Sequence, residues 1–392
     1  MERIRCAFFF HDTDFYSGGS RSLLDIIDDY IGQNNITVVA VFPSDRGSAI
    51  DYLRKRKVKI VCSHYYQIRY ELNETRADFL KKLPKRIVRL IGSRLWVDIK
   101  TSQELKNCNI NVIYSNTSFI LAGYWAARKL HVPIIAHFRE FGEEDHKIGV
   151  WIGRNNFYKI ANKFDRIICI SQSLKDKYKA NIDERGIRVI YDDVSKDYIN
   201  WTENDEKPEI KDSFNILLAG NLTPGKGQLV VLTRLAEFIK RNKNVTVYIA
   251  GNPSDTDYVN KMKSLITDID ISNQVKFLGL VKNMNLLRTK MHVGIVLSDM
   301  EAFGRVTIEG MLSGMIMIAS KTGGSVELIE NKVNGFLVDR DGKELERVVS
   351  YIQDNYNCLK EMQKKAYKFA TGFTKSKCSM NLYENIEELV NK

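Results

Sequence analysis

Hydrophobic positions along the chain form short runs that alternate with amphipathic stretches. The first run, IRCAFFF, is followed by a loop, by the helical stretch SRSLLDIIDDYIG and by a second run, ITVVAVFP. Apolar residues of the helical stretch fall on one face, with Ser20 placed to cap its first turn and Gly32 to end it. This order of strand, helix and strand predicts a parallel βαβ unit.

The same alternation continues to the end of the chain. Further buried strands are predicted from the runs VKIVCS, NVIYSN, VPIIAHF and RIICIS, and then from NILLAGN, VTVYIAGN, QVKFLGL, HVGIVLS and MIMIAS. Continuous apolar runs of this kind are typical of parallel sheets with helices on both faces. The chain is therefore predicted to be an α/β protein with two Rossmann-like, doubly wound halves.

A polar segment separates the two halves. Residues 196–213, KDYINWTENDEKPEIKDS, contain few aliphatic side chains, and we predict the interdomain linker there. The total of 392 residues suits two domains of nearly two hundred residues each. The N-terminal domain is predicted to span residues 1–197 and to be followed by a second domain from residue 198.

The chain carries a formal net charge of +11, which favours anionic partners such as nucleotide phosphates or lipid headgroups. The basic residues are scattered and no recognition motif accompanies them, so we expect no nucleic-acid partner. Six cysteines lack the spacing of a metal site and are interpreted as reduced core residues. The N-terminal apolar run is too short for a membrane span or a signal peptide, which predicts a cytoplasmic location.

One basic segment leaves two interpretations open. Residues 81–100, KKLPKRIVRLIGSRLWVDIK, carry five large apolar side chains between the charges: Ile87, Leu90, Ile91, Leu95 and Trp96. The preferred interpretation is a surface helix whose apolar face enters the core while its basic side chains stay in water. The alternative is a helix that lies on an anionic membrane surface.

Two carboxylates, Glu301 and Glu309, stand in the segment SDMEAFGRVTIEGMLSGMIMIAS. On one continuous helix they would be ~12 Å apart along the axis and could not share a small ligand. If the helix begins near residues 305–307, Glu301 lies on the preceding loop and Glu309 in the early helical turns. A nucleotide diphosphate would then sit at the positive end of the helix, near the backbone N–H groups of the Gly304 region.

This arrangement resembles the motif of two glutamates, with seven residues between them, in retaining glycosyltransferases of sequence family 4 (glycosyltransferase group 1). Downstream, SKTGGSVELIENKVNGFLV resembles the glycine pair, glutamate and Asn-Gly turn of that family, and upstream AGNLTPGKGQ resembles its phosphate-binding loop. The resemblance covers residues 216–338. It implies the GT-B fold, in which two Rossmann-like domains face each other across a cleft.

The resemblance also implies a role for each part of the chain. Residues 1–197 would bind the acceptor, residues 198–372 would bind the nucleotide sugar, and a helix at residues 373–392 would cross back to the N-terminal domain. Glu309 would hold the ribose, Glu301 the transferred sugar and Lys226 the donor phosphates. The predicted donor-binding residues are Gly18, Gly19, Asn221, Lys226, Phe303, Gly304, Arg305, Glu309, Gly323 and Gly324.

One departure from the family pattern concerns the phosphate-binding loop. Many relatives have Gly-Arg-Leu where this chain has Gly220, Asn221 and Leu222, so a phosphate-clamping arginine is missing. Arg305, at the predicted start of the helix, is the hypothetical replacement. A second departure is the pair of aspartates at residues 192–193, where relatives often have Asn-Gly.

In the N-terminal half, Gly18 and Gly19 follow the first strand, and His137 ends the run VPIIAHF, at the edge where such sheets bind ligands. The family has a histidine there that contacts the transferred sugar or lies beside the anomeric carbon. His137 and Glu301 are therefore the predicted catalytic residues. Three further residues, Arg139, Glu140 and Asp145, are predicted on the acceptor side, and Asn116 and Ser171 are interpreted either as cleft residues or as cap and turn residues.

The predicted reaction is the retaining transfer of a hexosyl or deoxyhexosyl group from a nucleotide sugar, with a UDP-sugar favoured. The leaving phosphate would take the proton of the acceptor hydroxyl, and neither a metal nor a cofactor beyond the nucleotide sugar is expected. The expected acceptor is a glycan or lipid-linked saccharide of bacterial polysaccharide synthesis, with the enzyme in the cytoplasm or peripheral on the inner face of the plasma membrane.

Other functions stay open. A catalytically silent relative that acts as partner subunit of an active transferase would explain the missing arginine. An epimerase or a phosphorylase of the same architecture is the remaining alternative.

Overall fold

The computed structural model describes residues 3–202, 205 and 207–391, so residues 203, 204 and 206 of the predicted linker lie outside the described residues. Contacts divide the chain into two compact units. One unit comprises Met1–Asp193 together with Ser376–Lys392 and is called the N-domain below. The other, Val194–Lys375, is called the C-domain.

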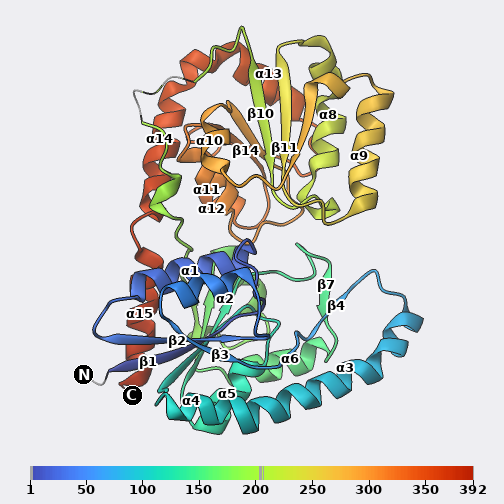
Figure 1. The fold of residues 1–392 in the computed structure, drawn as a ribbon. Coiled ribbons are helices and arrows are strands. Elements are labelled where there is room, and N and C mark those ends of the chain that lie inside the picture. Colours follow the sequence, from blue (N-terminus) through green and yellow to red (C-terminus); the bar gives the residue numbers. More distant parts are fainter. Residues whose placement is uncertain (1–2, 203–204, 206, 392) are drawn as a thin grey trace. The chain divides into compact units, whose positions relative to one another are not determined.

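The N-domain is built on a parallel sheet of seven strands in the order β3-β2-β1-β5-β6-β8-β9 (Figure 1). These strands are β1 (Ile4–Phe9), β2 (Ile36–Phe42), β3 (Lys59–Cys62), β5 (Val112–Asn116), β6 (Ile134–Phe138), β8 (Arg166–Cys169) and β9 (Ile187–Val189). The central strands β1, β5 and β6 are buried almost throughout because helices cover both faces. A separate antiparallel pair, β4 (Arg69–Glu71) and β7 (Ile148–Val150), was not predicted.

Helices of the N-domain follow the strands as expected for a doubly wound sheet. They are α1 (Gly18–Tyr30), α2 (Ser48–Lys55), α3 (Arg76–Trp96), α4 (Ser102–Asn107), α5 (Ala122–Leu130), α6 (Arg154–Ala161) and α7 (Gln172–Tyr178). In Figure 1, α1 lies on one face of the sheet, whereas α4 and α5 lie on the other. A π-helical turn, η1 (Val97–Thr101), joins α3 to α4.

The start of α1 differs from the prediction. The helix begins at Gly18, with Ser17 as its N-cap residue, so the two glycines form its first turn rather than the loop before it. Ser20 is no cap, because its hydroxyl donates to Asp12 Oδ1 at 2.5 Å. The helix ends at Tyr30, and Gly32 follows with a φ of 87°, which suits a glycine just beyond a helix end.

Helix α15 (Lys377–Val390) belongs to the N-domain although it is the last element of the chain. It packs against α1, β1 and β5, and its apolar face buries Cys378, Leu382 and Ile386 in the core of that domain. The Tyr30 hydroxyl donates to the carbonyl oxygen of Ser379 at 2.6 Å. The domain therefore completes its core with a segment that is remote in the sequence.

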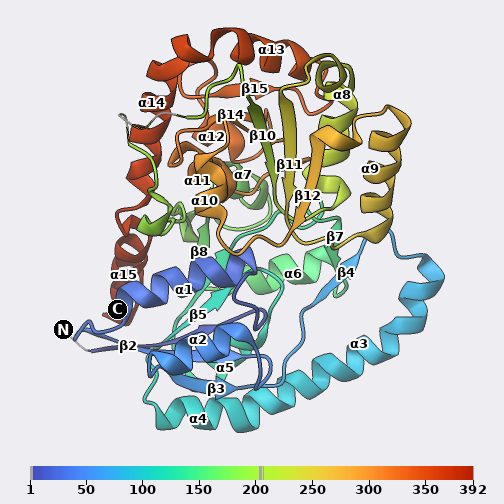
Figure 2. The same ribbon diagram turned by 45° about the horizontal axis from the view of Figure 1, so that its top comes forward.

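The C-domain has a parallel sheet of six strands in the order β12-β11-β10-β13-β14-β15 (Figure 2). Its strands are β10 (Phe214–Ala219), β11 (Val245–Ala250), β12 (Val275–Gly279), β13 (Val293–Val296), β14 (Ile316–Ser320) and β15 (Phe336–Val338). Its helices are α8 (Gln228–Arg241), α9 (Thr256–Asp268), α10 (Met284–Thr289), α11 (Arg305–Met311), α12 (Ser325–Leu328), α13 (Leu345–Asn355) and α14 (Lys360–Ala370). One apolar core joins the sheet to α8, α9 and α13.

The preferred interpretation of the basic segment is wrong for part of its apolar face. Helix α3 does form there, but Ser93 is the one residue within it that is fully buried. The side chains of Ile87, Ile91 and Leu95 are 43%, 54% and 55% exposed. Much of the apolar surface of the helix thus faces water instead of the core. Among the described residues, no helix combines the length and apolar character needed to cross a bilayer.

Candidate functional site

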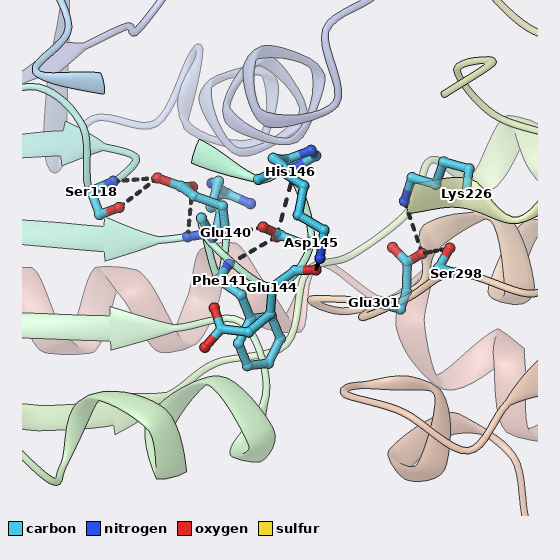
Figure 3. Close-up of polar contacts among 12 residues, drawn as sticks. Ser118, Glu140, Phe141, Glu144, Asp145, His146, Lys226, Ser298 and Glu301 are labelled. Carbon is cyan, nitrogen blue, oxygen red and sulfur yellow. Dashed lines mark hydrogen bonds and ion pairs between the residues drawn. The ribbon is translucent and has the colours of Figure 1, made fainter. Parts of the chain in front are cut away.

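A cluster of loops at the carboxyl edge of the C-domain sheet brings together Lys226 and Glu301. Strands β10 and β13 are neighbours, so the loops that follow them lie side by side. Asp299 N donates to the carbonyl oxygen of Gly225 at 2.8 Å, which joins the two loops through their backbones. Lys226 Nζ donates to Glu301 Oε2 at 3.0 Å, and Ser298 Oγ donates to the same oxygen at 2.9 Å (Figure 3).

The lysine loop owes its position to a glycine. Lys226 ends a 3₁₀ turn, and Gly227 follows with a φ of 73° as the N-cap residue of α8. A Cβ atom on Gly227 would lie 2.1 Å from the carbonyl oxygen of Leu297, at the end of β13. Only glycine combines this backbone conformation with so close an approach, and this contact holds Lys226 beside the glutamate loop.

The glycine pair supports the loop that carries Glu301. Gly323 has a φ of 52°, and a Cβ atom on it would lie 2.2 Å from the carbonyl oxygen of Glu301. On Gly324 the same atom would lie 2.6 Å from the carbonyl oxygen of Phe303. The backbone approach that the pair permits is therefore made to residues 301–303, and Gly324 N donates to the Glu301 carbonyl at 2.6 Å.

Glu309 lies in α11, which begins at Arg305 as predicted, and its side chain is 9% exposed. Its carboxylate accepts a hydrogen bond from Arg288 Nη2, whose side chain is 3% exposed. Arg305 Nε lies 4.0 Å from the other carboxylate oxygen. Two guanidinium groups thus flank the carboxylate. The Nε and Nη1 atoms of Arg288 are buried and have no hydrogen-bond partner among the described residues.

The remaining predicted donor-site residues fall around the same loops. Gly304 is the N-cap residue of α11, with a φ of 111°. Phe303 is buried, and its ring packs against Phe373 with 5.7 Å between centroids. Asn221 is exposed, and its carbonyl oxygen accepts from Gln228 Nε2 at 3.0 Å.

In the N-domain, the loop after β1 forms a polar cluster that was not predicted. His11 Nε2 lies 2.9 Å from Asp12 Oδ2 and 3.2 Å from Ser17 Oγ. A Cβ atom on Gly19 would lie 3.0 Å from the His11 ring, so the second glycine leaves room for it. Burial raises the pKa of Asp12, but the hydrogen bonds and charge of His11, with those of the serine hydroxyls, outweigh burial and lower this pKa to about 2.

His137 is fully buried at the end of β6. Its Nδ1 contacts the Tyr114 hydroxyl and lies 3.2 Å from Arg139 Nη2, whereas its Nε2 has no hydrogen-bond partner among the described residues. Burial, reinforced by the Arg139 charge, lowers the pKa of His137 well below its usual range. The ring is therefore neutral and enclosed, and its predicted contact with the transferred sugar stays a prediction.

Arg139 is the centre of a buried polar network. Its Nε donates to Asn116 Oδ1 at 2.6 Å, and its Nη1 donates to both carboxylate oxygens of Asp192, at 2.6 and 2.5 Å. Asn116 Nδ2 in turn donates to the carbonyl oxygen of Gly19 at 3.0 Å. The aspartate that departs from the family pattern thus neutralises the arginine and ties β6 to the chain after β9.

Glu140 and Asp145 bind backbone groups of their own domain (Figure 3). Glu140 is buried and accepts from the backbone N and the hydroxyl of Ser118, both at 2.7 Å. Burial raises the pKa of Glu140 although these hydrogen bonds oppose the rise. Asp145 accepts from the backbone N–H groups of Phe141 and Gly142, at 2.8 and 2.6 Å. Ser171 is a cap residue, because its hydroxyl accepts from Leu174 N at the start of α7.

Sequence reasoning missed three features of these sites. His11 and Asp12 directly follow a buried strand, and their position at the sheet edge was a signal that could have identified them. Ser298 also ends an apolar run. Arg288 offered no local signal, because nothing in the stretch NLLRTK indicates that this one cation is buried against Glu309. Among the described residues, no group of three or more His, Cys, Asp and Glu side chains is arranged to hold a metal ion.

Two α/β domains with parallel sheets, and a lysine–glutamate cluster at one sheet edge, define the class of GT-B glycosyltransferases. Two family models match the chain: "glycosyl transferases group 1" over residues 200–369 and "glycosyltransferase family 4" over residues 48–195. The chain belongs to the glycosyltransferase group 1 family. The order of the two matches along the chain agrees with the resemblance drawn from the sequence motifs.

Solved structures share the fold over the whole chain. HepE of Anabaena, solved in complex with UDP-glucose, is 21% identical, with a TM-score of 0.74 and 99% of both chains covered. A glycosyltransferase from Rickettsia africae is 20% identical, with a TM-score of 0.77, covering 100% of this chain and 99% of the other. At this identity, the likeness establishes the fold.

Curated relatives match over a shorter stretch. An uncharacterized glycosyltransferase of Methanocaldococcus jannaschii is 25% identical over 241 residues, which are 60% of this chain and 63% of the relative. A sucrose synthase of Melioribacter roseus is 27% identical over 46% of this chain and 25% of the relative. The chain thus spans less than two thirds of the length of these relatives.

Proposed function

We propose that the protein transfers a hexosyl or deoxyhexosyl group from a UDP-sugar to a hydroxyl of a glycan or lipid-linked saccharide, with retention of anomeric configuration. The observation that carries this proposal is the 3.0 Å contact between Lys226 and Glu301 on adjoining loops at the C-domain sheet edge. An ammonium beside a carboxylate offers a donor for phosphate oxygens and an acceptor for sugar hydroxyls within one small site.

The donor would contact both members of this ion pair. Lys226 Nζ would bind the diphosphate and offset the negative charge that grows as the glycosidic bond breaks. Glu301, held by Ser298 and by its backbone contact to the glycine pair, would accept hydrogen bonds from the sugar. Glu309 would hold the ribose, with its carboxylate oriented by Arg288 and Arg305. Arg305 is the proposed replacement for the arginine missing from the lysine loop.

The proposed reaction needs no protein nucleophile. The acceptor hydroxyl attacks the anomeric carbon on the face of the departing phosphate, and that phosphate takes up the hydroxyl proton. We propose that this reaction proceeds without a divalent metal, because Lys226 supplies positive charge at the phosphates. The UDP-sugar is favoured as donor because HepE, which shares the fold, was solved with UDP-glucose.

The N-domain would receive the acceptor. Arg139, Glu140 and Asp145 make their hydrogen bonds to neighbouring groups of that domain, so we propose that they shape the acceptor loop instead of contacting the acceptor directly. The first turn of α1, with Gly18 and Gly19, lies beside His11 and completes this edge. A lipid-linked acceptor would place the enzyme at the inner face of the plasma membrane.

A donor screen tests the proposal directly. We expect one UDP-sugar to raise the melting temperature of the purified protein, whereas GDP- and dTDP-sugars leave it unchanged. Lys226→Met should abolish this rise, since its ammonium would bind the phosphates. Lys321→Met is the matched control, because Lys321 forms a comparable ion pair, 3.1 Å from Asp339, elsewhere in the C-domain. An equal rise in melting temperature in Lys226→Met and Lys321→Met would contradict the proposed site.

A turnover assay separates the proposal from its alternatives. With the stabilising UDP-sugar and a pool of lipid-linked saccharides, we expect UDP release that depends on the acceptor and persists in the presence of EDTA. An α-linked product from an α-configured donor, read by proton NMR, establishes retention. An epimerase would change the sugar without an acceptor and without UDP release. A silent partner subunit would bind the donor and release nothing.

A further inference from the structure

Helix α3 presents an apolar stripe to solvent. Its large exposed apolar side chains are Leu80, Ile87, Val88, Ile91 and Leu95, each of which is 43% or more exposed. At 100° per residue, these five positions fall within about 100° of the helix circumference. The residues that pack toward the domain lie elsewhere on the circumference: the buried Ser93 is opposite the stripe, and the half-buried Leu83 and Leu90 are about 90° and 110° from its centre. The helix is thus apolar on two sides, and the N-domain covers one of them.

Positive charge borders this stripe. From Arg76 to Trp96, both included, the helix carries seven basic side chains and a single carboxylate, that of Asp78. Lys81, Lys85 and Arg89 follow the stripe along one side at successive helical turns. Charges of one sign beside a continuous apolar row are typical of helices that lie in the interface of an anionic bilayer.

A basic hollow lies between this helix and the β4–β7 pair. Its lining contains five cationic side chains and no carboxylate, together with two aromatic rings: Arg69, Lys82, Lys85, Arg86, Arg89, Tyr66 and Trp151 belong to this lining. The hollow measures about 590 Å³, which is ample for a phosphate with its attached headgroup.

The cations of the hollow differ in how far they are already neutralised. Lys82 and Arg86 form ion pairs with Glu74, at 2.5 and 2.7 Å. The Arg89 guanidinium lies 4.6 Å from the ring centroid of Tyr66. Arg69 and Lys85 have no ion pair or side-chain hydrogen bond among the residues that the structure describes. The hollow therefore keeps positive charge that no protein carboxylate offsets.

We propose that α3 is a docking surface for an anionic phospholipid bilayer. The apolar stripe inserts at the level of the headgroups, and the hollow beside it receives a lipid phosphate. A bilayer meets both halves of this surface at once, since it offers acyl chains and negative charge along the full length of the helix. Figures 1 and 2 show α3 at the periphery of the N-domain. This surface contains none of the residues proposed to bind the donor.

Sedimentation with sucrose-loaded vesicles tests the proposal. We expect the full-length protein to bind vesicles of phosphatidylcholine mixed with phosphatidylglycerol, to bind vesicles of phosphatidylcholine alone far more weakly, and to dissociate as salt is added. Charge reversal by Lys85→Glu with Arg89→Glu should weaken binding at least tenfold, since each cation near such a surface contributes a factor of about five. The stripe variant Ile91→Asp with Leu95→Asp should lose a comparable factor.

Matched controls make the same kinds of substitution, of an exposed apolar residue and of two exposed cations, in the C-domain. Leu286→Asp alters an exposed apolar residue of the C-domain, 59% exposed, and Lys240→Glu with Lys261→Glu reverses two exposed charges on α8 and α9. Both controls should bind anionic vesicles within a factor of about three of the wild type. Because the substituted α3 side chains are exposed, the melting temperature and its rise with the UDP-sugar should match the wild type in every variant. Membrane binding and donor binding can thus fail separately.

Three results would overturn the proposal. The wild type could fail to bind anionic vesicles at low salt, or the α3 variants could bind them as tightly as the wild type does. A third result is a wild-type dimer that the stripe variant converts to a monomer, with vesicle binding unchanged. That result would assign the stripe to a second copy of the chain.

Discussion

The backbone N–H of Gly324 donates a 2.6 Å hydrogen bond to the carbonyl oxygen of Glu301. This contact explains why two glycines follow β14: any side chain at either position would strike the backbone of residues 301–303. The glycine pair therefore fixes the position of the Glu301 loop relative to the sheet. It acts on the proposed donor site through the protein backbone.

Gly324→Ala should displace that loop. The new Cβ would lie 2.6 Å from the Phe303 carbonyl oxygen and 2.8 Å from its Cα, so the loop has to move. We expect at least tenfold weaker binding of the UDP-sugar by calorimetry, about 1.4 kcal/mol or more, and a loss of stability of about 1–3 kcal/mol. Gly372→Ala is the matched control in the same domain, since nothing lies within 4 Å of its added Cβ. Unchanged affinity in Gly324→Ala would show that the loop position does not matter.

Arg288 and Glu309 form a buried ion pair, so the effects of substituting them on the free energy of unfolding should not be additive. Arg288→Met leaves the carboxylate buried beside Arg305 alone, and we expect the free energy of unfolding to fall by about 3–5 kcal/mol in urea titrations. The double variant Arg288→Met with Glu309→Gln removes both charges and should recover part of that loss. The exposed pair of Arg347 and Glu344 is the control, since Arg347→Met should cost less than about 1 kcal/mol. Additive losses in the double variant would contradict the coupling.

The sequence predicted the central strands of both sheets and the start of α11, because long apolar runs and helix signals are local. It did not predict β4, β7, β9 or β15, since three residues are too few to give a hydrophobic pattern. Periodicity identified the apolar face of α3 but not its environment. Which side of a helix meets the core depends on the tertiary packing.

Site residues divide in the same way. Lys226, Glu301 and Glu309 stand in motifs whose spacing is local, and the structure places the first two 3.0 Å apart. The partners that orient them are remote or carry no motif: Arg288 reaches Glu309 from another helix, and Gly227, at the N-cap of α8, approaches Leu297, which follows β13. Contacts of this kind depend on the order of the strands and on the positions of the loops relative to the sheet, which no local pattern of residues specifies.

The stability of the protein should depend on pH through His137. The pKa of His137 is lowered in the folded state. As the pH falls through about 6.5, the unfolded chain therefore binds a proton at this histidine, whereas the folded chain does not. Stability due to this group is therefore present above pH 6.5 and is lost as the pH falls, by about 1.4 kcal/mol per pH unit. We expect His137→Gln to flatten the pH dependence of the unfolding free energy between about pH 6.5 and 5.

His131→Asn is the control for this measurement, because His131 is an exposed histidine of the same domain. Its unfolding free energy should follow the wild type across the same pH range. If the wild type and His137→Gln show the same slope, the imidazole is able to take up a proton inside the fold. The buried environment proposed for His137 would then be wrong.

Helix α15 should be essential to the N-domain. Leu382 is fully buried there, in the same core as Leu23 and Ile27 of α1. Leu382→Ala removes three side-chain carbon atoms from this core, and we expect it to lower the free energy of unfolding by about 2–5 kcal/mol. Met380 lies on the same helix with its side chain 59% exposed, so Met380→Ala should change the stability by less than about 0.5 kcal/mol. Similar small effects of both variants in urea titrations would show that α15 detaches from the domain in solution, and that β1 and α1 hold their core without it.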